Sequence, residues 1–85
     1  MQIIKGTHKG KTATLRQFAN DWMTVDITDG DPGVIVNPRQ VRLDPDEQKR
    51  MRNSLTDYEQ GDRTCGRFWA EWQMNDDGTF TARPR

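Results

Sequence analysis

The sequence contains few of the side chains from which metal and redox sites are built. Its 85 residues include one cysteine and one histidine. A single cysteine cannot form an internal disulfide, and one cysteine with one histidine does not supply the ligands of a zinc site. We therefore expect a chain from a reducing, cytoplasmic compartment that binds no metal and needs no cofactor.

Long apolar runs and an excess of charge of one sign are also missing. No stretch approaches the 18 or so apolar residues of a transmembrane helix, so we expect no membrane association. The 13 basic residues are balanced by 13 acidic ones, which leaves a net charge of zero. This balance excludes the bulk positive field of a protein that coats nucleic acid, so a role in nucleic-acid binding would have to be local.

The side chains needed for catalysis are scattered. His8, Ser54 and Cys65 fall in three different expected elements, and the acidic residues cluster at turns and at one helix start, where capping explains them. Catalysis requires a positioned nucleophile or an acid–base pair. We therefore expect a protein that is not an enzyme.

What the first half does contain is β-strand patterning. Residues 2–5, 12–18 and 22–27 carry apolar or β-branched side chains in alternation, with glycines or Asn-Asp between them. A β-branched run follows at 34–36, and residues 39–43 fit one 3₁₀ turn leading into a short closing strand. Five short strands in about 43 residues are typical of a small barrel.

A boundary follows at Asp44, an N-cap residue with proline after it and Glu47 in the capping-box position. The sequence predicts a helix over about 45–60 with Gly61 as its C′ residue, and then a β-hairpin over about 64–83 that turns at Asn-Asp-Asp-Gly. The expected fold is mainly β (α+β): a five-stranded SH3-like barrel over 1–43, with the helix and hairpin over 44–85 packed on the barrel or on a partner.

The stretch 3–15 reads Ile-Ile-Lys-Gly-Thr-His-Lys-Gly-Lys-Thr-Ala-Thr-Leu. It resembles the KOW motif of ribosomal proteins and of transcription elongation factors of the NusG and Spt5 type. The resemblance covers residues 1–43 and implies an SH3-like barrel. Members of the family use the barrel loops to contact RNA or RNA polymerase, which would bring His8, Lys9 and Lys11 to the contact surface.

Basic side chains near this motif are the first candidate site. Lysines beside glycine-rich backbone are suited to phosphate oxygens. The same loop equally suits an acidic protein surface, or serves only to keep the barrel soluble. The residues expected to contact nucleic acid or a partner are Lys5, His8, Lys9, Lys11, Arg16, Arg39 and Arg42.

Aromatic residues with charged neighbours are the second candidate site. Trp22 lies on the polar face of its strand, and Trp69 lies opposite Phe68 and Trp72 if residues 67–74 are a strand. Each tryptophan is either an exposed interface anchor or packed between the two halves of the chain. The expected protein interface consists of Trp22, Arg67, Trp69 and Glu71.

These features predict a small non-enzymatic binding module, an adaptor or regulator of a protein or ribonucleoprotein partner, for which the resemblance implies the transcription or translation machinery. The alternative is direct binding of RNA or DNA through the loop Gly6 to Lys11. A homodimer formed by edge-to-edge pairing of the hairpins is compatible with the first hypothesis, and would bury Trp69.

Overall fold

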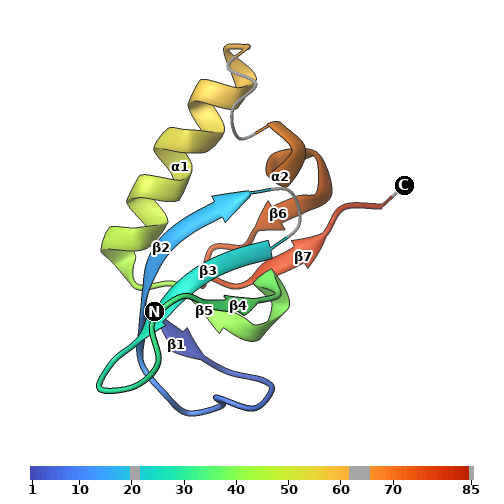
Figure 1. Ribbon diagram of the computed structural model, residues 1–85. Helices are drawn as coiled ribbons and strands as arrows, with labels where there is room; N and C mark the ends of the chain where they lie inside the picture. Colours follow the sequence, from blue (N-terminus) through green and yellow to red (C-terminus); the bar gives the residue numbers. More distant parts are fainter. Residues whose placement is uncertain (20–21, 62–65, 85) are drawn as a thin grey trace.

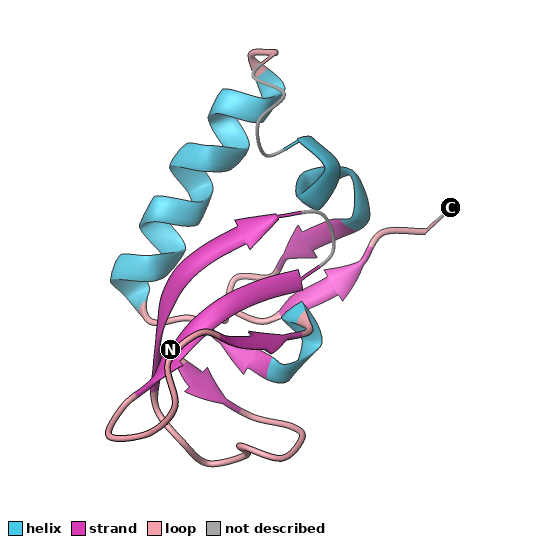
Figure 2. Ribbon diagram, viewed as in Figure 1, coloured by secondary structure: helices cyan, strands magenta, loops and turns pink. Residues whose placement is uncertain are grey.

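The computed structural model describes residues 1–19, 22–61 and 66–84 of the chain. Seven strands, two α-helices and one 3₁₀ turn follow one another in mixed order, with the strands of the first half forming a curved layer (Figures 1 and 2). The expected Asn20-Asp21 turn and Cys65 lie outside the described residues.

The five strands predicted for the first half are present. They are β1 (Gln2–Ile3), β2 (Ala13–Ala19), β3 (Trp22–Ile27), β4 (Val34–Val36) and β5 (Val41–Arg42). The 3₁₀ turn before the last strand, η1 (Pro38–Gln40), is also confirmed, and its N-cap Asn37 accepts a hydrogen bond from the Arg39 amide at 2.9 Å.

Strand pairing divides these five strands into two antiparallel sheets. β2, β3 and β4 form one sheet in that order, and β1 pairs with β5. An isolated bridge between Gln2 and Thr12 connects the two sheets. Within the described residues this pairing does not close a barrel, so the strands are confirmed while the barrel stays a prediction.

Helix α1 (Pro45–Glu59) begins where the sequence predicted. Asp44 is its N-cap, and the Asp44 amide donates to the Glu47 carboxylate at 3.4 Å in the expected capping box. Gly61 follows the C-cap with a φ of 102°, the left-handed conformation that ends many helices. Capping chemistry thus sets both ends of this helix.

The prediction of a strand through residues 67–71 is wrong. Helix α2 (Gly66–Glu71) takes its place, and only β6 (Trp72–Met74) and β7 (Phe80–Ala82) form the hairpin. The predicted turn at residues 75–78 is confirmed, since Gly78 has a φ of 87° and donates its amide to the Asn75 carbonyl. A helix brings neighbouring aromatic residues to one core, which alternation in a strand would not.

One cluster of buried side chains runs through both halves of the chain. Ile3, Met23 and Val25 from the first half belong to the same cluster as Met51 and Phe68 from the second. Edge-to-face aromatic pairs connect the halves, with the Phe18 and Phe68 ring centroids 4.9 Å apart. α1 lies beside β2 on the side away from β4, and α2 lies near β6 and contacts β2 (Figure 1).

Candidate binding surface

The outer face of the three-stranded sheet carries two exposed apolar side chains. Along β3 the residues Met23, Val25 and Ile27 are buried, so Trp22 and Thr24 belong to the opposite, solvent-facing side. Ile35 of β4 pairs with Thr24 and lies on that same side. Trp22 is 40% exposed and Ile35 is 68% exposed, and in the described parts of the chain no other large apolar side chain is exposed.

Register brings these two side chains close together. Because Ile35 lies opposite Thr24, Trp22 is its diagonal neighbour on the same sheet face. Diagonal neighbours in an antiparallel pair lie about 7–8 Å apart, within reach of an aromatic side chain. The two therefore form one apolar surface. We call Trp22, Thr24 and Ile35, together with the adjoining Lys5 and His8, the sheet-face site.

Lys5 and His8 adjoin Ile35 through a shallow hollow. Its volume is about 220 Å³, and it is lined by Lys5, His8, Ile35 and Gln40 together with Ile3, Thr7, Val34 and Val36. The basic loop thus borders the apolar face of the sheet. A surface that combines apolar area with a lysine and a histidine fits a partner surface that is itself apolar and acidic.

Three backbone amides of the basic loop donate hydrogen bonds to carbonyls of the same loop or of β1. The Lys9 amide donates to the Gly6 carbonyl at 3.1 Å, Gly10 to Ile3 at 2.8 Å, and Lys11 to His8 at 3.0 Å. Gly6 and Gly10 have φ values of 90° and 89°, which this tight loop requires. The amides of Lys9, Gly10 and Lys11 are therefore used within the loop, and its lysine side chains are the groups left to contact a partner.

Arg39 lies next to this region, in a second hollow that also involves Lys5. That hollow has a volume of about 520 Å³, and Asn75 and Thr81 contribute to its wall. The Arg39 guanidinium lies 5.6 Å from the centroid of the Trp72 ring, a cation–π contact that connects η1 to the hairpin. Lys5 is thus common to the two hollows.

Of the other predicted basic residues, Arg16 lies on the solvent-facing side of the same sheet, because its partner Asp26 shares the face of Trp22 and Thr24. Arg16 is paired across the sheet with Asp26, with 3.5 Å between Nε and Oδ2, and Arg42 donates to the Gln2 side chain at 2.7 Å. Lys9 and Lys11 are exposed on the loop. Arg16 and Arg42 are thus engaged in contacts within the chain, whereas Lys9 and Lys11 remain exposed.

The four residues of the predicted protein interface do not share one exposed surface. Trp22 is exposed, whereas Trp69 is completely buried and donates its indole N–H to Ser54 Oγ at 3.2 Å. Trp69 is therefore a core residue of this chain and is not available as an interface anchor or for burial between hairpins. Arg67 is exposed and Glu71 half-buried, both on α2.

Sequence reasoning missed Ile35. The run Val34–Val36 is β-branched throughout, so its composition alone assigns no face to the central residue. In an extended strand the central residue points opposite to its two neighbours, so with Val36 buried, Ile35 points to solvent. Alternation was the available signal, but three apolar residues in a row conceal it.

No group of three or more His, Cys, Asp or Glu side chains in residues 1–19, 22–61 and 66–84 is placed to hold a metal ion. None of the helices in those ranges has the length and apolar character needed to cross a bilayer.

Comparison of the chain with known protein families, with curated proteins and with solved structures found no match.

Proposed function

We propose that the chain is a small non-enzymatic binding module, an adaptor or regulator that holds a protein or ribonucleoprotein partner on its sheet-face site. The observation that supports this most is that exposed Trp22 and exposed Ile35 are diagonal neighbours on one sheet face. Tryptophan is enriched among the residues that dominate binding energy at protein interfaces. A folded chain with a small core gains nothing in stability from leaving two such side chains in water.

The chemistry around this apolar pair indicates the kind of partner surface. Lys5 and His8 border Ile35 in the 220 Å³ hollow, and Arg39 lies in the neighbouring one. An apolar protein surface with acidic residues at its rim would match both parts of the site. We further propose that residues 1–43 form a KOW-type SH3-like barrel, and that the partner belongs to the transcription or translation machinery, as that resemblance implies.

Direct binding of RNA or DNA is the second candidate function. Lys9 and Lys11 extend from a glycine-rich loop and are exposed, and Lys5 and His8 begin the same loop. Each phosphate contact would contribute about −0.7 to −0.9 to the slope of log K against log salt. Binding through four such contacts would therefore weaken steeply with salt, whereas binding through Trp22 and Ile35 would change little.

A pull-down from lysate, with and without nuclease, tests the proposal. The bait proteins are the tagged wild type, the double variant Trp22→Ala/Ile35→Ser and the double variant Lys9→Glu/Lys11→Glu. Gln73→Ala, an exposed change on β6 outside this face, is the matched control. We expect a nuclease-resistant partner that the wild type and the Gln73 variant retain and the Trp22/Ile35 variant loses.

The contrary results are equally specific. Material that disappears on nuclease treatment and on Lys9→Glu/Lys11→Glu, but persists with Trp22→Ala/Ile35→Ser, would replace the proposal with direct nucleic-acid binding. Circular dichroism of each bait confirms that a lost partner does not reflect a lost fold.

A further inference from the structure

The outer edge of β2 is a second surface, distinct from the sheet-face site. β2 ends its sheet and pairs only with β3 along its length. On its outer side the Ala13 amide donates to the Met1 carbonyl at 2.9 Å, and the Leu15 amide donates to the Glu47 carboxylate at 3.4 Å. Past Leu15 this edge has no backbone hydrogen-bond partner in the part of the chain that the structure describes.

The register identifies which backbone groups point outward there. The bond from Leu15 to Glu47 shows that the Leu15 amide faces away from β3. The register shifts at Arg16, a one-residue bulge, after which Phe18 lies opposite Met23. Backbone groups of an edge strand point alternately toward and away from its neighbour. Past the bulge, the Phe18 amide and carbonyl therefore point away from β3, as those of Leu15 do. Since the Leu15 amide is already bonded to Glu47, the Leu15 carbonyl and the Phe18 amide and carbonyl are the groups that this edge offers to an incoming strand.

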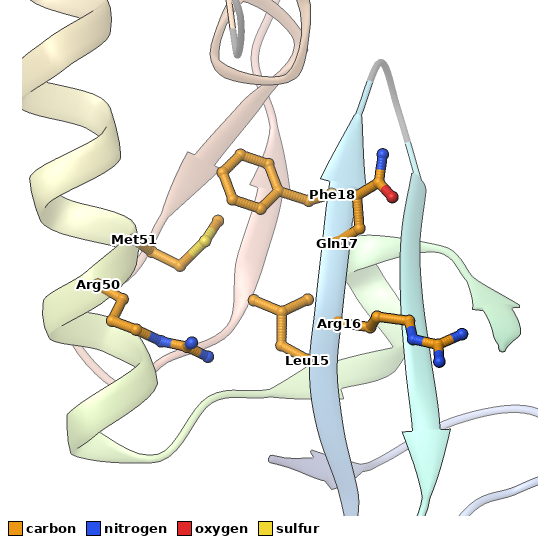
Figure 3. A pocket seen from close by; sticks show the side chains of 6 residues that line it. All are labelled: Leu15, Arg16, Gln17, Phe18, Arg50 and Met51. Carbon is orange, nitrogen blue, oxygen red and sulfur yellow. The ribbon is translucent and has the colours of Figure 1, made fainter. Parts of the chain in front are cut away.

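A groove runs along this edge, between β2 and α1 (Figure 3). Its volume is about 290 Å³, and the side chains of Leu15, Phe18 and Met51 converge on it from both elements. Arg50 reaches into the groove from α1, whereas the Arg16 side chain points away from it (Figure 3). The groove thus combines an apolar floor, an open strand edge and one cation.

Arg50 lies near Asp44 and Glu47, with which it lines a hollow, yet it forms no ion pair within the described residues. Glu47, one turn earlier on α1, is occupied by the N-terminal ammonium of Met1, with 2.5 Å between the ammonium nitrogen and Oε1. Arg50 itself takes part in none of the chain's described ion pairs. An apolar groove that ends at an unpaired guanidinium matches an apolar side chain next to a carboxylate.

We propose that this groove binds an extended, acidic peptide segment of a partner protein. The segment adds one short antiparallel or parallel strand to β2, places an apolar side chain over Leu15, Phe18 and Met51, and directs a carboxylate to Arg50. A second copy of this chain fits less well. Two-fold pairing of β2 edges would bring the same groove against itself, and would add another arginine instead of the missing carboxylate.

The proposal is tested by titrating the ¹⁵N-labelled full chain with a synthetic peptide. The probe is an acetylated octapeptide of alternating valine and threonine with one glutamate, compared with the same peptide carrying lysine in place of glutamate. We expect chemical-shift changes at the amides of residues 15–18 and 50, and about tenfold tighter binding of the glutamate peptide. N-methylation of the residues whose amides face β2 should abolish binding, and N-methylation of the alternate residues should not.

Two variants of α1 provide the matched comparison. Arg50→Glu should weaken binding of the glutamate peptide by at least about tenfold. Arg52→Glu, an exposed change on the same helix at a residue that contacts Gln48 and does not line the groove, should leave it unchanged. Trp22→Ala should also have no effect, which keeps this test independent of the sheet-face site.

Three results would overturn the proposal. Equal losses with Arg50→Glu and Arg52→Glu would remove the role of the groove cation. Shift changes centred on Thr24 and Ile35 would assign the peptide to the sheet-face site. Concentration-dependent changes at residues 15–18 without peptide would show that a second copy of the chain is the occupant.

Discussion

At the scale of single residues, one buried charge connects the start of the chain to α1. The N-terminal ammonium of Met1 is fully buried and contacts Glu47 at 2.5 Å and Asp44 at 3.2 Å. It also donates to the Ala13 carbonyl at 2.7 Å. Burying a charge is costly unless it is paired and hydrogen-bonded, so these contacts act together. Capping patterns predicted Glu47 as an N3 residue but not as the partner of this ammonium.

Replacing Glu47 tests this pair. Glu47 is 8% exposed, and Glu47→Gln would leave the buried ammonium with only Asp44 to compensate it. We expect a loss of about 2–4 kcal/mol in the free energy of unfolding, measured with urea. Asp46→Asn, a change of an exposed acid in the same helical turn, should cost less than about 1 kcal/mol. Equal costs for the two variants would contradict a special role for Glu47.

Asp44 makes the stability depend on pH. Hydrogen bonding to the Met1 ammonium, and then to Glu47, holds the pKa of the Asp44 carboxyl below its ordinary value of 3.8. A carboxyl whose pKa is lower in the folded state stabilises the fold above its unfolded pKa, and this contribution is lost as pH falls from about 4 through the folded pKa. The side chain is 61% exposed, so solvent screening keeps the effect small.

This dependence is checked by urea unfolding of the wild type and of Asp44→Asn at pH values from about 2.5 to about 7. The wild type should be the more stable protein near pH 7, and the difference should shrink as pH falls below about 4. Added salt of about 1 M should reduce the difference at neutral pH. A difference that does not vary with pH would mean that the asparagine alters packing or capping instead of charge.

At the scale of elements, capping residues and turn glycines were sufficient to predict where α1 begins and ends and where the last hairpin turns. Proline after Asp44, Glu47 at N3 and a left-handed Gly61 predicted α1 at both ends. The hairpin turn at Gly78 was equally readable. Residues 66–71 were misread, because Phe68, Ala70 and Trp72 alternate as a strand requires, while Phe68 and Trp69 are both buried in the structure. A six-residue helix has fewer than two turns, which is too short for a helical periodicity to be recognised in the sequence.

Gly78 connects the hairpin to the start of α1. A Cβ atom at Gly78 would lie 2.5 Å from the Leu43 carbonyl oxygen, and the Gly78 carbonyl accepts the Leu43 amide at 2.9 Å. Gly78→Ala should therefore cost at least about 2 kcal/mol, from left-handed strain and a displaced backbone contact. Thermal unfolding followed by circular dichroism measures the loss.

Gly10→Ala is the control for Gly78→Ala. Gly10 has a similar φ of 89°, but a Cβ atom there would meet nothing within 4 Å. Its cost should be limited to backbone strain, about 1 kcal/mol. If the two alanines proved equally destabilising, the contact between Gly78 and Leu43 would contribute nothing.

At the scale of the whole molecule, the two halves of the chain share one core. Phe68, Trp69 and Phe80 from the second half pack on Phe18 and its neighbours from the first. A two-stranded hairpin is marginal alone in water, so β6 and β7 depend on this packing. The core thus accounts for Trp69 and Trp72, and leaves Trp22 as the exposed tryptophan.

The tryptophans should differ sharply in their contribution to stability. Trp69 is 0% exposed, and Trp69→Ala removes a large side chain from the centre of the core. We expect it to cost about 3–5 kcal/mol in urea unfolding followed by circular dichroism. Trp22→Ala should cost less than about 1 kcal/mol. A mild effect at Trp69, or a severe one at Trp22, would contradict the division between core and sheet-face site.

The sequence alone determined the features that depend on a few adjacent residues. These are the five short strands, both ends of α1 and the turn of the last hairpin, because alternation, capping groups and glycine conformation act locally. Tertiary structure alone decided which tryptophan is buried, that residues 66–71 are helical, and that β3 and β4 pair in the register that brings Ile35 beside Trp22. Each of these depends on contacts between segments distant in sequence, and packing across such contacts overrides local pattern.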